Sequence, residues 1–186
     1  MKLVPKIVII SLLVLIIFFF GLGVYDVFFG GNYYPVAYEE EIKAASEEFG
    51  VEEHIIYATI YCESSFDKNA VSNMDAHGLM QLLPSTFEWL AGRECTEEEL
   101  HDPALNILYG TKYLSILYKR YNNWDMAHAA YHAGNGRVDK WIEEGEIVVD
   151  ADGRLTGIPI RATEVYVEKV NFAKEKYIEI LKKEEK

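Results

Sequence analysis

The order of apolar and polar residues divides the chain into one continuous hydrophobic segment and a longer part with helical periodicity. Residues 7–25 read IVIISLLVLIIFFFGLGVY and contain no charged residue. A helix of about 20 apolar residues is long enough to span the ~30 Å hydrocarbon core of a membrane. We therefore expect residues 1–25 to form a single N-terminal transmembrane anchor.

A cleaved signal peptide is the alternative for this segment. Such a peptide has a shorter apolar stretch that ends at small residues, whereas phenylalanines occupy positions 18–20 and 28–29 here. Lys2 and Lys6 precede the segment, and acidic residues follow it. The positive-inside bias then predicts a single-pass protein of the cell membrane, with a cytoplasmic N-terminus and the remaining chain outside the cytoplasm.

The rest of the pattern predicts a linker over residues 26–38 and one all-α domain over residues 39–186. Gly30, Gly31 and Pro35 mark the linker. Apolar residues then recur at spacings of three and four, which predicts helices over residues 39–49, 52–63, 84–90, 103–121, 124–133, 138–143 and 163–183. Residues 147–160 form a short irregular stretch with room for a small hairpin around Asp152 and Gly153.

Charge and cysteine content narrow the class of function. The chain of 186 residues has 18 Lys and Arg against 30 Asp and Glu, a formal net charge of −12. A nucleic-acid partner is excluded by this balance, because binding phosphates needs a basic face. Two cysteines without a CxxC motif provide neither a disulfide framework nor a zinc site built from thiols.

Glu63 is the carboxylate whose position favours chemistry. Ile56, Thr59 and Ile60 precede it by seven, four and three residues, which places Glu63 on the apolar face of its helix. Partial burial and the negative end of the helix dipole both disfavour the ionised form, so its pKa should rise. A carboxyl that stays protonated near neutral pH can act as a general acid. A glutamate that simply turns into solvent is the alternative.

Three short motifs around Glu63 carry a family resemblance. They are Glu63-Ser64-Ser65-Phe66, Gly78-Leu79-Met80-Gln81 and Ala130-Tyr131-His132-Ala133-Gly134. In this order and spacing they resemble the lytic transglycosylases related to the C-terminal domain of soluble lytic transglycosylase, glycoside hydrolase family 23. The resemblance covers residues 39–183. It implies a lysozyme-like all-α fold that needs neither metal nor cofactor.

The same resemblance implies a substrate and a reaction. Members of the family cut the β-1,4 bond between N-acetylmuramic acid and N-acetylglucosamine in peptidoglycan strands, and they leave a 1,6-anhydro ring on the muramic acid. Ordinary glycosidases use two carboxyl groups, and the sequence offers no evident partner for Glu63. A transglycosylase needs only one carboxyl group. This group first donates a proton to the leaving oxygen and then takes the proton of the C6 hydroxyl.

The resemblance also assigns roles to individual residues. Glu63 matches the single catalytic acid/base. Tyr131 matches a tyrosine that faces it, and core packing is the alternative for this ring. Gly78 to Gln81 match a segment lining the cleft, where Met80 offers an apolar wall; ordinary packing at a helix start is the alternative for Met80 and Gln81. The residues expected to bind substrate are Ser64, Ser65, Gly78, Leu79, Met80, Gln81, Tyr131, His132 and Tyr166.

The chain departs from the family pattern at two positions. His132 stands where asparagine is usual; a neutral imidazole still donates and accepts, but it titrates near neutrality. Ala162, in the segment Ile158 to Thr163, stands where glutamate is common, and Glu164 lies two residues further on. These departures leave product choice and efficiency open.

Two other functions and two other sites remain as alternatives. A goose-type-lysozyme-like hydrolase would share the fold and Glu63 but add water, and a scaffold would bind the cell wall without cutting it. His128 and His132 have the spacing of metal ligands on a helix, yet no third ligand is near in sequence. Cys62 and Cys95 could form a disulfide, although a buried free thiol fits Cys62 better.

Overall fold

The computed structural model describes residues 34–151 and 153–184. The chain divides into two compact units, Met1–Tyr34 and Pro35–Lys186, and the second holds nearly all of the described residues. The expected anchor over residues 1–25 lies outside the described residues. Within the described ranges, no helix is long and apolar enough to cross a membrane.

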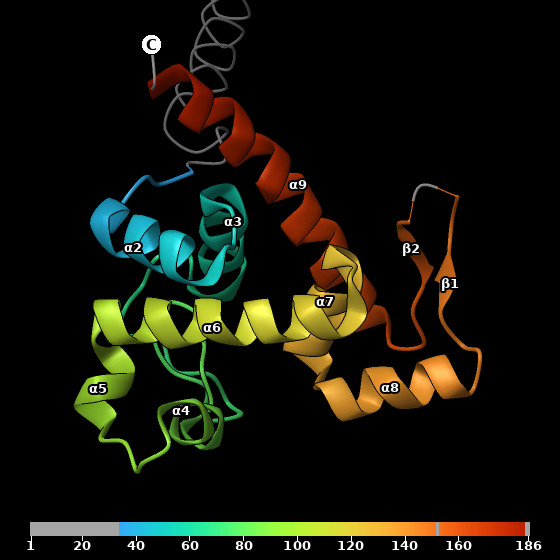
Figure 1. The fold of residues 1–186 in the computed structure, drawn as a ribbon, viewed down its shortest axis with the longest axis horizontal. Helices are drawn as coiled ribbons and strands as arrows, with labels where there is room; N and C mark the ends of the chain where they lie inside the picture. Colours follow the sequence, from blue (N-terminus) through green and yellow to red (C-terminus); the bar gives the residue numbers. More distant parts are fainter. Residues whose placement is uncertain (1–33, 152, 185–186) are drawn as a thin grey trace, which may run out of the picture. The chain divides into compact units, whose positions relative to one another are not determined.

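The second unit is mostly helical, as expected (Figure 1). Along the chain its elements are α2 (Glu39–Phe49), α3 (Glu53–Ser64), α4 (Pro84–Ala91), α5 (Glu97–His101), α6 (Pro103–Tyr121), α7 (Trp124–Ala133), α8 (Asn135–Glu143), β1 (Val148–Val149), β2 (Leu155–Gly157) and α9 (Arg161–Glu184). The two strands pair antiparallel and form the small hairpin for which the sequence left room.

The helix expected from Val138 begins earlier, at Asn135. The reason is Gly134, whose backbone adopts a φ of 87° and thereby ends α7 and begins α8 at one residue. A residue with a side chain rarely adopts a positive φ. The chain therefore turns between the two helices without an intervening loop.

Helix α6 runs through the middle of the domain (Figure 1). Helix α2 packs on it from one side, and α4 and α5 from the other. Its start follows from local chemistry, since the Asp102 side chain accepts a hydrogen bond from the Leu105 backbone and Pro103 occupies the first turn. Ile107, Leu114 and Leu117 form its buried stripe, which confirms the expected periodicity.

Helices α3 and α9 position the functional residues. Every residue of α3 from Ile55 to Ile60 is buried, and α9 packs along this helix and along α7. The Tyr57 ring of α3 stacks on the Tyr177 ring of α9 with 5.1 Å between centroids. This packing brings the last turn of α3, with Glu63, beside the first turns of α9.

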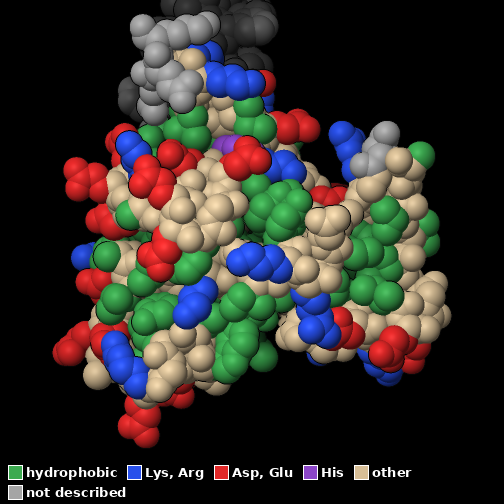
Figure 2. All heavy atoms as spheres, viewed as in Figure 1, with side chains coloured by type: hydrophobic (Ala, Val, Ile, Leu, Met, Phe, Trp, Pro, Cys, Tyr) green, Lys and Arg blue, Asp and Glu red, His purple; other side chains and the backbone are tan. Residues whose placement is uncertain are grey.

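The face of the domain drawn in Figure 2 carries charges of both signs. Acidic and basic side chains are interspersed over it, and apolar side chains show between them.

Candidate active site

Glu63 lies in the last turn of α3, partly buried. The Tyr166 hydroxyl of α9 donates a hydrogen bond of 2.6 Å to its Oε1 atom. Burial raises the pKa of Glu63 from its ordinary value to about 7, and the hydrogen bond from Tyr166 opposes the rise. The rise expected from burial is therefore present. Near neutral pH, a large fraction of the Glu63 carboxyl groups carries a proton that can be donated.

Two tyrosines accompany this carboxyl. Tyr166 is 7% exposed, and Tyr131 of α7 is partly buried. Burial, reinforced by the nearby charge of Glu63, raises the pKa of both phenols well above its ordinary value. Both hydroxyl groups therefore keep their hydrogens in the pH range where Glu63 titrates. Each can act only as a hydrogen-bonding group there.

The segment Gly78 to Gln81 forms a tight turn closed by its neighbours. His77 and Leu82 exchange two backbone hydrogen bonds of 2.9 Å. The Ser64 hydroxyl donates to the Leu79 carbonyl at 2.8 Å, and the Tyr131 hydroxyl donates to the Met80 carbonyl at 2.7 Å. The turn is thus fixed to α3 beside Glu63 and to α7.

The side chains of this turn pack against the protein, which is the alternative that the sequence left open for Met80 and Gln81. Leu79 and Met80 have no exposed surface. Met80 packs against Gly110 of α6, where a Cβ atom would lie about 2.8 Å from the Met80 Cβ. The structure therefore places Met80 in the core rather than in a cleft wall. Gln81, with a φ of 48°, donates its amide hydrogens to the Ala70 and Gly78 carbonyls.

His132 extends the group of aromatic rings to the surface. Its imidazole stacks on the Tyr166 ring with 4.7 Å between centroids, and its Nδ1 lies 3.2 Å from the Thr163 hydroxyl. Burial of the ring lowers the pKa of His132. Ala162 is exposed beside it. Both departures from the family pattern therefore lie next to Tyr166, the hydrogen-bond partner of Glu63.

Ser65 is the candidate that stands apart. It is exposed, adopts a φ of 53° at the end of α3, and its hydroxyl lies 3.4 Å from the Tyr61 carbonyl. Ser65 therefore ends the helix that carries Glu63, and this structural role accounts for a small polar residue at the position. The other candidates, from Ser64 to Tyr166, are brought together around Glu63 or the turn beside it.

Sequence reasoning missed Asn106. This residue of α6 has no exposed surface, and its amide makes three hydrogen bonds to the backbone around the Gly78–Gln81 turn. One signal was available, because a polar residue lies next to Ile107 on the buried stripe of α6. Its partners are 26 and 29 residues away in the turn, and no local pattern reveals them.

The other candidate sites lack the geometry for metal or disulfide chemistry. No group of three or more His, Cys, Asp or Glu side chains within residues 34–151 and 153–184 could hold a metal ion. His128 is buried in the core, where burial lowers its pKa to about 4. Cys62 and Cys95 are free thiols. Burial raises the pKa of Cys62 to about 12, so it keeps its hydrogen.

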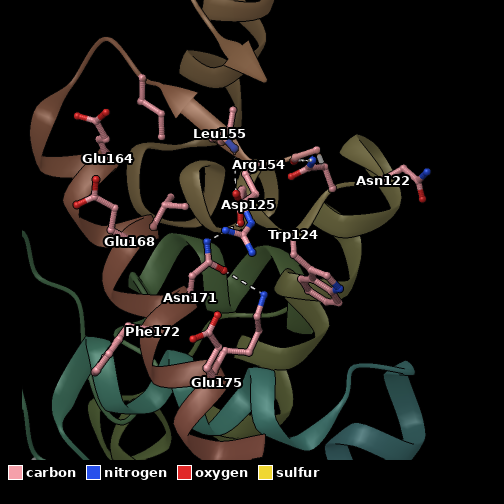
Figure 3. A pocket seen from close by; sticks show the side chains of 15 residues that line it. Asn122, Trp124, Asp125, Arg154, Leu155, Glu164, Glu168, Asn171, Phe172 and Glu175 are labelled. Carbon is pink, nitrogen blue, oxygen red and sulfur yellow. Dashed lines mark hydrogen bonds between the residues drawn. The ribbon is translucent and has the colours of Figure 1, made fainter. Parts of the chain in front are cut away.

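A pocket of about 720 Å³ lies away from Glu63, between the start of α7, the hairpin and α9 (Figure 3). Asp125 forms part of its lining and is 7% exposed. Its carboxylate accepts hydrogen bonds from the Leu155 backbone at 3.0 Å and from the Asn171 side chain at 2.8 Å. These bonds tie the hairpin to α7 and α9.

Fold and site together define a class of protein: a lysozyme-like helical domain with a partly buried carboxyl of raised pKa at the end of a buried helix. The chain belongs to the transglycosylase SLT domain family, whose model matches residues 40–148. The fold expected from the sequence resemblance is thereby confirmed.

Curated relatives of this chain are named lytic murein transglycosylases. The soluble lytic murein transglycosylase of Escherichia coli is 31% identical over 143 residues, which are 74% of this chain and 22% of that protein. The membrane-bound lytic murein transglycosylase C of Haemophilus ducreyi is 31% identical over 168 residues, covering 75% of this chain and 45% of that protein. This chain thus spans less than half the length of either.

A solved structure has the same fold. An inactive mutant of the lytic transglycosylase Slt from Pseudomonas aeruginosa superposes with a TM-score of 0.73 at 30% identity. The match covers 80% of this chain and 25% of that one. The domain described here therefore corresponds to one part of a longer relative.

Proposed function

We propose that this protein is a membrane-anchored lytic transglycosylase. In this proposal it cleaves the β-1,4 bond between N-acetylmuramic acid and N-acetylglucosamine in peptidoglycan and leaves a 1,6-anhydro ring. The observation that carries the proposal is Glu63, a carboxyl with a pKa of about 7 that accepts a hydrogen bond from Tyr166. It occupies the position where the family resemblance puts the catalytic acid/base.

The first step uses the protonated form of Glu63. Its proton passes to the glycosidic oxygen as the bond to the anomeric carbon breaks, and N-acetylglucosamine leaves with a hydroxyl group. Positive charge develops at the muramic acid ring, where the substrate's own N-acetyl group assists. The hydroxyl of Tyr166 stabilises the carboxylate that Glu63 has become, since it already donates to Oε1.

The second step uses the ionised form. The Glu63 carboxylate removes the proton from the C6 hydroxyl of the muramic acid, and the C6 oxygen bonds to the anomeric carbon. Glu63 ends protonated, as it began, so no water is consumed and one carboxyl suffices. A pKa near 7 suits both steps, because neither form is strongly disfavoured at neutral pH.

Tyr131 contributes through its oxygen atom. Its hydrogen is donated to the Met80 carbonyl, so the lone pairs of the phenol oxygen remain for another partner. An oxygen that accepts rather than donates stabilises developing positive charge. In the proposal this oxygen faces the anomeric carbon beside Glu63. The candidates with accessible surface hold the glycan strand: Ser64, Ser65, Gln81 and His132. The buried Gly78, Leu79 and Met80 shape the turn behind them, and Tyr166 holds Glu63.

The location belongs to the proposal as well. The uncharged segment over residues 7–25 supports a single membrane span, and the lysines before it support a cytoplasmic N-terminus. Protease treatment of intact cells lacking an outer barrier tests this topology. We expect the C-terminal domain to be digested; a domain that is protected until the cells are lysed would contradict it.

The activity is tested by incubating the full chain, purified in detergent, with peptidoglycan. A Glu63→Gln variant runs beside it, and mass spectrometry reads the products. We expect anhydro-muropeptides from the wild-type protein and none from the variant. Reducing-end muropeptides without the anhydro form would establish a hydrolase, and bound glycan without any product would establish a scaffold; each contradicts the proposal.

A further inference from the structure

We propose that Asn106 is a positioning residue for the reaction: it holds the turn residue Met80 so that the Tyr131 hydroxyl directs its hydrogen away from the substrate and its lone pairs toward it. This inference rests on the proposed function. Asn106 touches neither the substrate nor Glu63 in this proposal. It acts through two successive groups, the backbone of Met80 and the Tyr131 phenol.

The hydrogen bonds of Asn106 fix the turn on both sides. Its Oδ1 atom accepts from the Met80 N–H at 2.7 Å. Its Nδ2 group donates to the His77 carbonyl at 2.9 Å and to the Leu100 carbonyl at 2.8 Å. With no exposed surface, the amide has no water to replace these partners. The orientation of the amide is therefore determined, because exchanging its O and N atoms would break all three bonds.

The contact with the turn is close enough to require a glycine. A Cβ atom on Gly78 would lie 2.6 Å from the Leu100 carbonyl oxygen and 2.8 Å from the Asn106 Cγ. Gly78 also has a φ of 74°, which disfavours any side chain. The Gly78 of the second sequence motif is thus explained by the approach of Asn106, without an appeal to bound sugar.

The backbone of Met80 passes this constraint to Tyr131. Its N–H is held by Asn106, and its carbonyl accepts the Tyr131 hydroxyl at 2.7 Å. These two groups belong to adjacent planar peptide units that meet at the Met80 Cα atom. The second unit is held as well, because the Gln81 N–H donates to the Gly78 carbonyl at 3.2 Å. The Met80 side chain, packed against Gly110, fixes the Cα atom between the two units.

The direction of the Tyr131 hydrogen matters because Glu63 competes for it. The turn that accepts the Tyr131 hydroxyl also accepts the hydroxyl of Ser64, the residue after Glu63. Burial raises the pKa of Tyr131, and the charge of Glu63 raises it further. If the Met80 carbonyl moved away, the phenol could donate to the Glu63 carboxylate instead. It would then stabilise the ionised form and present a hydrogen, rather than lone pairs, to a centre where positive charge develops.

The test is a double-mutant cycle between Asn106→Ala and Tyr131→Phe, measured in the full chain with a soluble glycan substrate. We expect each single variant to lower kcat by about 10-fold or more with KM changed little, since a group acting in the transition state is lost. We expect the double variant to be no slower than the slower single variant, within about twofold. A double variant whose loss of kcat equals the product of the two single losses would overturn the inference.

Ser115→Ala is the matched control on the same helix. Ser115 is buried, nine residues further along α6, and its hydroxyl donates to the Phe49 carbonyl at 3.0 Å. This variant loses a buried hydrogen bond but not the link to Met80, so we expect wild-type kcat and KM. A loss of kcat equal to that of Asn106→Ala would overturn the inference, because general loosening of α6 would then explain both.

Asn106→Asp covers the case in which the alanine variant does not fold. The ionised aspartate would face the carbonyl oxygens of His77 and Leu100, whereas the protonated form donates to one of them and still accepts from Met80. We expect the ratio of variant to wild-type kcat to rise as the pH falls; a constant ratio would overturn the inference. If the wild-type protein forms no anhydro-muropeptides, the proposed function fails first, and this outcome is distinct.

Discussion

Two carboxyl groups packed beside α9, Asp125 and Glu63, differ in how many donors their oxygens meet. Asp125 accepts two N–H groups, one from the Leu155 backbone and one from Asn171. Glu63 accepts from the Tyr166 hydroxyl, and within the described part of the chain no second donor reaches it. Burial therefore raises the pKa of Glu63 to about 7, and the single hydrogen bond opposes this rise only in part.

The comparison teaches that a large hollow does not by itself locate the reaction. The pocket over Asp125 has a volume of about 720 Å³, yet polar groups in its lining, Asp125 and Asn171, already bind one another (Figure 3). Asn171 in turn accepts a hydrogen bond from Lys174. Such a network stabilises a fold. In the proposed function the reactive group is Glu63, whose hydrogen bonding is less complete.

The largest expected effect separates the two carboxylates by activity. Glu63→Gln should lower the rate of peptidoglycan cleavage roughly 10²–10⁴-fold, because the variant can neither donate nor accept the transferred proton. Asp125→Asn should leave the rate per folded molecule unchanged. Turbidity and muropeptide release measure both rates. A comparable loss of activity in the Asp125 variant would remove the distinction.

For the stability of the fold, we expect the Asp125 variant rather than the Glu63 variant to show the loss. Asp125→Asn turns one of two accepting oxygens into a donor that faces the Leu155 N–H or the Asn171 amide. We expect the free energy of unfolding to fall by about 1–3 kcal/mol, the usual cost of leaving a buried polar group unsatisfied. Urea denaturation followed by circular dichroism measures it. An unchanged midpoint would mean that the network contributes little.

Glu63→Gln should stabilise the fold at neutral and higher pH. The pKa of Glu63 in the folded protein, about 7, lies above its ordinary value of 4.5. As pH rises from about 4.5 to 7, the unfolded chain loses this proton first, so the wild-type protein loses stability over that interval. The variant escapes the loss, which should be on the order of 1–2 kcal/mol after allowance for solvent screening.

Denaturation midpoints at pH 4 and pH 8 check this sign. The difference between Glu63→Gln and the wild-type protein should be larger at pH 8. A glutamine variant that is less stable at pH 8 than at pH 4, relative to the wild type, would show that the Glu63 carboxylate is well solvated or paired. The activity of the variant plays no part in this measurement.

The smallest effect concerns Tyr166. Its hydrogen bond lowers the pKa of Glu63 against the larger effect of burial. Tyr166→Phe should therefore raise this pKa further and move the alkaline limb of the pH–rate profile upward, by a fraction of a pH unit to about one unit. A limb that moves downward would mean that Tyr166 does not stabilise the carboxylate. The measurement is the pH profile of kcat/KM for the wild-type protein and for Tyr166→Phe.

Local patterns were sufficient to predict much of the fold and the partial burial of Glu63. Spacing from Ile56, Thr59 and Ile60 placed Glu63 on a buried face, and its partial burial accounts for the raised pKa. Asp102 and Pro103 marked the start of α6 because a cap and a first-turn proline act within a few residues. Such signals depend only on neighbouring positions in the chain.

Hydrogen-bond partners could not be predicted in the same way. The sequence resemblance pointed to Tyr131 as the tyrosine facing Glu63, but the hydrogen bond to Glu63 comes from Tyr166, 103 residues further along the chain. That bond depends on how α9 packs against α3. Asn106 was missed for the same reason, since its partners are set by the packing of α6 against the turn. Packing was the alternative for Met80 that the sequence left open, and only the structure shows its contact with Gly110.

The most direct test of this account is a titration of the Glu63 carboxyl itself. Carbon-13 labelling of glutamate side chains, with Glu63→Gln to assign the resonance, reports the protonation of this group in the folded protein. The account predicts a midpoint near pH 7. A midpoint near the ordinary value of 4.5 would contradict it, because Glu63 would then be ionised at neutral pH and could not begin the reaction as an acid.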